Sequence, residues 1–263
     1  MSMETIRNLD NIVQIAVLLT VAAGAFLSLG KSARPMSMAF FALGMTTYLV
    51  SDIYWIAHLL LKGGSRLPFT AADMGDFGLF LLLASASKAV FEGDSSRPPF
   101  VLTVAVSLFG LSNIALWTAW NGEWIRNLIG GIALGYYYWR VARDLWAAKA
   151  LSRREWQGLL VLCVVLIGLL IGWFWLTASW RKRVEYGCYV LLFAGIVWFY
   201  AKTVLALRSG RSKAAVSLAF ATLAWSACTM YMCWDPIYYA ADTAFTLTAP
   251  LALLALRQEA CVA

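Results

Sequence analysis

Apolar stretches long enough to cross a lipid bilayer follow one another along almost the whole chain, and only short polar loops separate them. A helix needs about 20 apolar residues to span the roughly 30 Å of hydrocarbon in a bilayer. Such stretches lie near 12–30, 36–61, 71–91, 99–119, 125–147, 156–177, 185–207, 214–234 and 237–256. The sequence therefore predicts an all-α fold, a polytopic integral membrane helical bundle with about nine (eight or nine) transmembrane helices.

The composition supports this interpretation, because 62% of the 263 residues are hydrophobic and only 13% are charged. Soluble domains are about half apolar and about a quarter charged. A soluble fold of this length could not hide so much apolar surface, whereas lipid can solvate it. Since every loop is short, we expect residues 1–263 to form a single transmembrane domain without a soluble domain.

The net charge of +7 does not indicate a nucleic-acid partner, because the basic residues are scattered through the loops and no nucleic-acid-binding motif is present. Five cysteines without CxxC spacing and a single histidine predict no metal site. The sequence contains no P-loop, HExxH or Ser-His-Asp pattern, so we predict no catalytic residues and no cofactor.

The Lys and Arg residues predict an orientation. If the spans alternate, 14 of the 21 basic residues fall on the side of the C-terminus, and cytoplasmic loops carry the excess. The other seven are Arg7, Lys62, Arg66, Arg126, Arg181, Lys182 and Arg183. We therefore expect a multi-pass protein of the bacterial cytoplasmic membrane with its N-terminus outside and its C-terminus inside.

Ionisable side chains inside the spans are the main candidates for function, because burying them in a bilayer is costly. Asp52 lies well inside the second span. A purely structural alternative is that its carboxyl group is hydrogen-bonded to Ser51, to Tyr48 or to a neighbouring helix. His58 follows six residues later, about 120° away around a helix, so the two do not share a face.

Further acidic residues open the third and ninth spans. Thr70 and Asp73 fit a capping box, and Asp235, which precedes a proline, fits a helix N-cap. Asp76 and Asp242 lie deeper in their spans, so capping does not explain them. By contrast, Arg140 and Asp144, spaced i and i+4, are expected to form an ordinary pair on a helix surface.

Under the expected orientation, several ionisable and aromatic residues fall in the outer half of their spans. The ionisable ones are Asp52, His58, Asp76, Asp235 and Asp242. We therefore predict an outward-facing, acid-lined and aromatic-walled cavity between the second, third, eighth and ninth helices, which would bind a cation or a cationic ligand if wet. The alternative is an interfacial aromatic belt with separate helix caps. The candidate ligand-binding residues are Asp52, Trp55, His58, Asp76, Trp234, Asp235, Tyr238 and Asp242.

Residues 51–55 (Ser-Asp-Ile-Tyr-Trp) and 68–73 (Pro-Phe-Thr-Ala-Ala-Asp) together resemble the membrane modules found ahead of bacterial diguanylate cyclase and PAS signalling domains. Those modules place an Asp-aromatic pair in one helix and an Asp at the start of the next, after a proline-containing turn. The chain is expected to have no cytoplasmic output domain. The resemblance therefore implies a sensor module that signals through a partner protein, or a stand-alone relative of such modules.

Ser51-Asp52 and residues 75–80 (Gly-Asp-Phe-Gly-Leu-Phe) are similar to the acid-bearing helices of the lysoplasmalogenase-like membrane family. That resemblance implies an intramembrane lipid hydrolase in which paired Asp residues serve as general acid and base. The family's His-aromatic element in the following helix has no match here, since His58 lies elsewhere.

Three functions therefore remain open. The leading hypothesis is a non-enzymatic membrane protein that binds a small or lipidic ligand in the cavity and acts as a sensor or a transporter. A sensor would have a signalling partner protein, and a transporter would have a transport partner protein. The alternatives are the lipid hydrolase and a purely structural or subunit role. In each case the lipid bilayer surrounds the protein.

Overall fold

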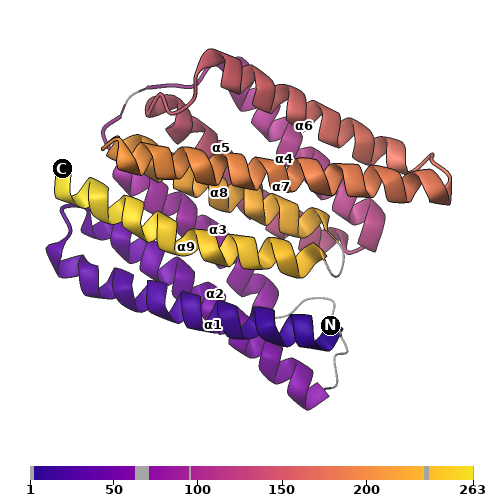
Figure 1. Cartoon of the computed structure of the whole chain (residues 1–263), viewed down its shortest axis with the longest axis horizontal. Helices are drawn as coiled ribbons and strands as arrows, with labels where there is room; N and C mark the ends of the chain where they lie inside the picture. The colour runs from indigo at the N-terminus through magenta and orange to yellow at the C-terminus, as the bar shows by residue number, and fades with distance from the viewer. Residues whose placement is uncertain (1–2, 63–70, 95, 234–236, 263) are drawn as a thin grey trace.

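The computed structural model describes residues 3–62, 71–94, 96–233 and 237–262, and this part of the chain contains nine α-helices and no strand (Figure 1). The helices run side by side as a bundle, which confirms the all-α prediction. The elements are α1 (Met3–Ser28), the 3-10 helix η1 (Leu29–Lys31), α2 (Pro35–Lys62), α3 (Ala71–Val90), α4 (Phe100–Asn121), α5 (Trp124–Ala147), α6 (Arg153–Trp173), α7 (Ala178–Arg208), α8 (Ser212–Met232) and α9 (Ile237–Val262).

Seven of the described helices are long and apolar enough to cross a membrane, namely α1, α2, α4, α6, α7, α8 and α9. The chain is thus a helical membrane bundle. Helices α3 and α5 are not among these seven, which were selected by length and composition. Both carry charged residues that the structure places in the interior, such as Asp73 in α3 and Arg140 in α5. Their low hydropathy follows from polar groups that face protein rather than lipid.

Helix α8 lies at the centre of the bundle and α6 at its edge. In the apolar stretch of α8, 94% of residues are buried, against 11% in α6. Helix α8 packs against α3, α5, α7 and α9. It is rich in Ala, Ser and Thr, and such small residues let neighbouring helices approach closely. The exposed Leu and Val side chains of α6 suit lipid instead.

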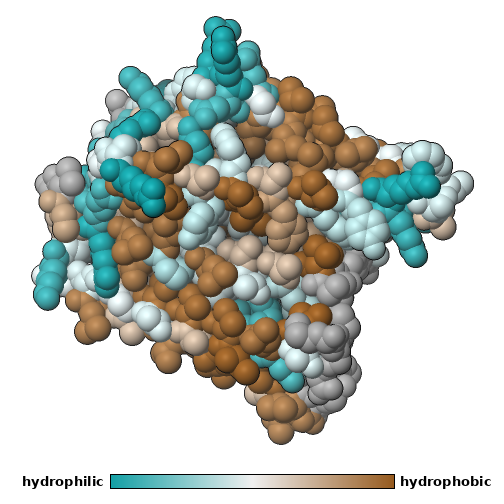
Figure 2. All heavy atoms as spheres, in the orientation of Figure 1, coloured by the Kyte–Doolittle hydropathy of each residue, from teal (hydrophilic) through white to brown (hydrophobic). Residues whose placement is uncertain are grey.

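Short loops connect consecutive helices, so the starts of α1, α3, α5, α7 and α9 gather at one end of the bundle. The C-terminus and the η1 turn lie at the other end (Figure 1). Figure 2 shows hydrophilic side chains crowded near the C-terminal end and hydrophobic ones over the flanks between the ends. This distribution is typical of a protein whose middle contacts hydrocarbon.

Close packing between helices depends on glycines. A Cβ atom on Gly130 would lie 2.3 Å from the ring of Phe77, and one on Gly131 would lie 2.1 Å from Ile114. The missing side chains at this glycine pair therefore let α5 pack closely against α3 and α4. At Gly135 an added Cβ would meet nothing within 4 Å.

The expected surface pair of Arg140 and Asp144 is wrong, because both side chains are buried with about 1% exposure. Arg140 contacts both carboxylate oxygens of Asp144, through Nη2 at 2.6 Å and Nε at 2.8 Å. The two residues do pair at the predicted i and i+4 spacing, but this face of α5 is directed toward the bundle core. Sequence reasoning failed here because α5 has polar residues on a face that protein covers.

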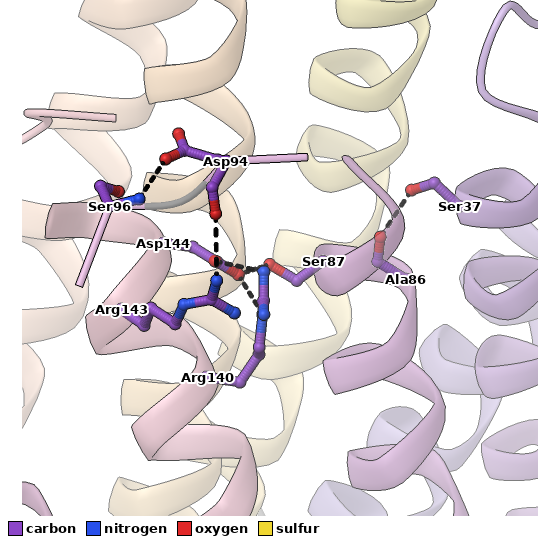
Figure 3. A network of polar contacts seen from close by, with 8 residues as sticks. All are labelled: Ser37, Ala86, Ser87, Asp94, Ser96, Arg140, Arg143 and Asp144. Atoms are coloured by element: carbon purple, nitrogen blue, oxygen red, sulfur yellow. Dashed lines mark hydrogen bonds and ion pairs between the residues drawn. The ribbon is translucent and has the colours of Figure 1, made fainter. Parts of the chain in front are cut away.

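A wider polar network surrounds this pair (Figure 3). Ser87 of α3 donates a hydrogen bond to Asp144 Oδ2 at 2.5 Å, and Arg143 donates to the backbone carbonyl of Asp94. The loop residue Asp94 also accepts a bond from the backbone N–H of Ser96, and this bond is the largest cause of its lowered pKa. The network therefore joins α3, α5 and the loop after α3 at the end of the bundle opposite the N-terminus.

Candidate functional site

A cavity of about 620 Å³ is lined by residues from six helices, α2, α3, α4, α5, α8 and α9, and from their caps. Four of these helices, α2, α3, α8 and α9, are those expected from the sequence. Helices α4 and α5 contribute the remaining wall, and the sequence analysis did not include them. Ligand pockets commonly measure 300–1,000 Å³, so the cavity is of a size that accepts a small molecule.

Helix α2 presents one face to the cavity. Tyr48, Ser51, Asp52 and Trp55 all line it, and their i, i+3, i+4 and i+7 spacing places them on one side of a helix. His58 lies one turn further but does not line the cavity. Its ring stacks on that of Trp55, with centroids 5.7 Å apart. A role for His58 in ligand binding therefore stays a prediction, whereas Trp55, on which it stacks, lines the cavity.

Two of the cavity's carboxylates share one arginine. The Nε atom of Arg126 lies 2.7 Å from Asp73 Oδ1, and its Nη1 lies 2.8 Å from Glu123 Oε2. Arg126 belongs to the first turn of α5, and Gly122 ends α4 in the left-handed conformation just before it (φ 73°). This tight turn brings α5 directly beside α4 and so sets the guanidinium at the cavity wall.

A third carboxylate is held by a hydroxyl group. Ser51 donates a hydrogen bond to Asp76 Oδ1 at 2.9 Å, which connects α2 to α3. Close contact of these helices requires Gly75, because a Cβ there would lie 2.9 Å from the Ser51 side chain. The bond holds the carboxyl of Asp76 against α2, and Asp52 and Asp76 line the same cavity.

Asp242 lies behind the cavity wall rather than on it. Its side chain is buried, and the hydroxyl of Tyr48 donates a hydrogen bond to its Oδ1 at 2.6 Å. On the α1 side, Gln14 donates to the same tyrosine oxygen at 3.5 Å, and Thr243 donates to Asp10 at 2.5 Å. This polar layer ties α1, α2 and α9 together beneath the cavity.

Asp52 differs from these carboxylates. Its Oδ2 atom is buried and has no hydrogen-bond partner in the described part of the chain. The two hydroxyls expected to bind it bond elsewhere, Ser51 to Asp76 and Tyr48 to Asp242. Asp76 lines the same cavity and carries a like charge, and like charges close together oppose one another.

Aromatic rings form much of the remaining wall. Trp117 and Tyr231 lie with ring centroids 5.0 Å apart and tilted by 43°, and Tyr238 and Tyr239 meet edge to face at 5.5 Å. Trp117 is only 6% exposed, and its Nε1 has no hydrogen-bond partner among the described residues. The wall therefore offers ring faces together with a vacant N–H donor.

The structure thus brings together some of the predicted residues and separates others. Asp52, Trp55, Asp76 and Tyr238 line the cavity. Asp242 lies behind the wall, in contact with the cavity-lining Tyr48. Trp234 and Asp235, with the predicted N-cap, lie outside the described residues, as does the Thr70 half of the predicted capping box.

Sequence reasoning missed the contribution of α5. Glu123, Arg126, Asn127, Gly130 and Leu134 line the cavity from the start of this helix. Their spacing of three or four residues marks one helical face. A search for polar residues that recur at helical spacing would have found this face, whereas inspection of single acidic residues in apolar spans did not.

The chemistry of the site is that of carboxylates and aromatic rings. Among the residues that the structure describes, no group of three or more His, Cys, Asp or Glu side chains is arranged to hold a metal ion. The cavity wall therefore combines four carboxylates, one arginine and several aromatic rings. Comparison of the chain with protein-family models, curated proteins and solved structures gave no match.

Proposed function

We propose that this chain is a multi-pass membrane protein that binds a small molecule in the cavity and acts as a sensor or a transporter. The observation that carries the proposal is Asp52, a carboxylate on the wall of a 620 Å³ cavity with one buried oxygen that lacks a hydrogen-bond partner among the described residues. Buried polar groups are normally satisfied, so an exception at a cavity indicates a ligand contact.

The proposed location is the bacterial cytoplasmic membrane, with the N-terminus outside and the C-terminus inside. The excess of Lys and Arg on the C-terminal side supports this orientation. The cavity lies at the opposite end of the bundle and would then face the outside. A sensor would pass the binding event to a partner protein, as the resemblance to signalling modules implies.

Ligand-dependent stabilisation tests this function directly. The protein, purified in detergent, is mixed with cationic, neutral and anionic small molecules, and its melting temperature is measured. At least one class should raise the melting temperature, because a ligand that binds only the folded state stabilises it. The shift should shrink when Asp52, Asp76 or Asp242 is replaced by Asn. It should persist in Asp94→Asn, a matched change at the other end of the bundle.

Unchanged ligand shifts in all three cavity variants would reject the proposed function. If a ligand is found, uptake of that molecule into proteoliposomes separates a transporter from a sensor. Accumulation inside the vesicles supports transport, and binding without accumulation supports sensing.

A second candidate is the intramembrane lipid hydrolase. The observation that favours it is that Asp52 and Asp76 line the same cavity, since general acid–base catalysis needs two carboxyls near one water. Incubation with a lysoplasmalogen should then release a fatty aldehyde, detected by mass spectrometry. Loss of this product in both Asp52→Asn and Asp76→Asn would support the hydrolase, and no product from the unaltered protein would reject it.

A further inference from the structure

The charges on the cavity wall are not balanced. Among the described residues, four carboxylates line the cavity and one guanidinium faces them. Arg126 is already engaged, because it contacts Asp73 and Glu123. It therefore offers no partner for Asp52, which makes no ion pair with any described residue. An anionic ligand would meet repulsion here, and a cation would relieve it.

The ring faces add a second attraction for positive charge. Aromatic faces are negative and bind cations within about 6 Å, with Trp the strongest. The cavity has three Trp residues on its wall, Trp55, Trp117 and Trp120. Trp117 is tilted by 43° from the ring of Tyr231, so the two rings present faces in different directions. Such angled rings enclose a bulky cation better than a single flat surface.

The size and chemistry of the site favour an organic cation over a metal ion. A volume of about 620 Å³ is far larger than one ion, and the described residues offer no cluster of metal-binding side chains. The unpartnered Nε1 of Trp117 is a hydrogen-bond donor at the same wall. A ligand that satisfies it must also carry an acceptor, such as a hydroxyl or ether oxygen.

We propose that the cavity binds a small organic cation, an amine or quaternary ammonium compound with an oxygen acceptor. The cationic group is placed at Asp52 among the tryptophan rings, and the oxygen accepts from Trp117 Nε1. This inference rests on the proposed binding function and names its ligand class.

The test compares probes of matched shape and different charge. Choline is compared with its uncharged carbon analogue 3,3-dimethyl-1-butanol and with the anion 3,3-dimethylbutanoate. Benzyltrimethylammonium and 2-phenylethylamine complete the set. Binding to the purified protein in detergent is measured by quenching of tryptophan fluorescence and by the melting temperature. Choline and at least one other cation should bind, and the neutral analogue and the anion should not.

Two variants locate the contacts. Asp52→Asn should weaken cation binding by about tenfold or more, because it removes the charge partner. Trp117→Phe keeps a ring but removes the N–H donor. It should therefore weaken choline more than benzyltrimethylammonium, which has no oxygen. Asp94→Asn is the control and should bind every probe as the unaltered protein does.

Equal binding of choline and its neutral analogue would overturn the inference, as would the absence of binding by all three cations. The comparison of probes on the unaltered protein needs no variant. It therefore tests the cation inference even if a substitution impairs folding. If neutral or anionic molecules bind in a manner that depends on Asp52, the proposed binding function stands and the cation inference fails. If no class of molecule binds, both fail.

Discussion

Two aspartates with buried carboxylate oxygens, one near each end of the bundle, show how differently a membrane helix bundle can treat a carboxylate. Asp144 is about 1% exposed, and Arg140 and Ser87 contact its two oxygens (Figure 3). Asp52 lines a cavity, and its Oδ2 has no partner among the described residues. Since the first is paired with a cation of the protein and accepts a hydrogen bond from Ser87 of α3, it holds helices together. The second has one carboxylate oxygen left for a ligand that enters the cavity.

The comparison teaches that burial in a membrane helix does not by itself identify a functional acid. The two aspartates look alike in sequence, because both lie within largely apolar helices. What separates them is pairing, which depends on neighbouring helices. Removing a group from the paired region should therefore cost stability, whereas removing the charge at Asp52 should change ligand binding instead.

The largest effect is expected for Arg140→Met. It leaves the carboxylate of Asp144 buried without its cation, and breaking such a pair costs about 3–5 kcal/mol. Thermal unfolding in detergent should show a markedly lower melting temperature. Asp94→Asn, close to the same network but in a loop, should change stability by less than about 0.5 kcal/mol. Similar losses in the two variants would contradict the structural role assigned to the pair.

A smaller loss is expected for Gly130→Ala at the cavity wall. The new methyl group would overlap the Phe77 ring, and overpacking costs about 1–3 kcal/mol. Gly168→Ala in α6 is the matched control, since a Cβ there meets nothing within 4 Å. We expect the control to keep or slightly raise the melting temperature, because Ala favours helix over Gly. If both variants melt at the same temperature, the close contact of α5 with α3 is not needed.

Tyr48→Phe should have a moderate effect beneath the cavity. It removes the hydrogen bond to Asp242, and polar contacts between membrane helices contribute about 1–2 kcal/mol. The measurement is again thermal unfolding, with Tyr54→Phe as a control on the exposed side of the same helix. A loss confined to Tyr48→Phe supports the polar layer, and a loss equal in the two variants argues against it.

The smallest change in stability is expected for Asp52→Asn without ligand. Because Oδ2 of Asp52 has no hydrogen-bond partner among the described residues, the substitution breaks no hydrogen bond at that atom. The neutral amide also removes the repulsion between the Asp52 carboxylate and those of Asp76 and Asp242. The melting temperature should stay the same or rise slightly. A fall as large as that of Arg140→Met would mean that Asp52 is structural and would remove the contrast between the two aspartates.

Much of the fold was predictable, because hydrophobic stretches of membrane length specify helices almost independently of their neighbours. The predicted spans 36–61 and 71–91 agree closely with α2 and α3. Helix α1 begins earlier than the apolar stretch 12–30. Its polar residues Asp10 and Gln14 are buried against α9 and α2, so low hydropathy there did not mean a loop.

Part of the candidate site was predictable as well. Tyr48, Ser51, Asp52 and Trp55 share a helix face by spacing alone, and the inference that Asp52 and Asp76 lie at the same end followed from alternating spans. The pairing of Arg126 with Asp73 could not be read in the same way. These residues lie on different helices, and no periodicity within one helix specifies which neighbour it meets.

The sequence by itself determined that the chain forms a bundle of membrane-length helices and that Asp52 and Asp76 lie toward the same end. Each apolar stretch is stabilised in lipid as a helix by its own residues, so the helices can be recognised from local sequence alone. Only the tertiary structure decided that Asp144 forms an ion pair with Arg140 and accepts a hydrogen bond from Ser87, and that Asp52 Oδ2 has no hydrogen-bond partner in the described part of the chain. The physical reason is that a buried charge depends on what other helices bring within hydrogen-bond distance, which is a property of packing rather than of order along the chain.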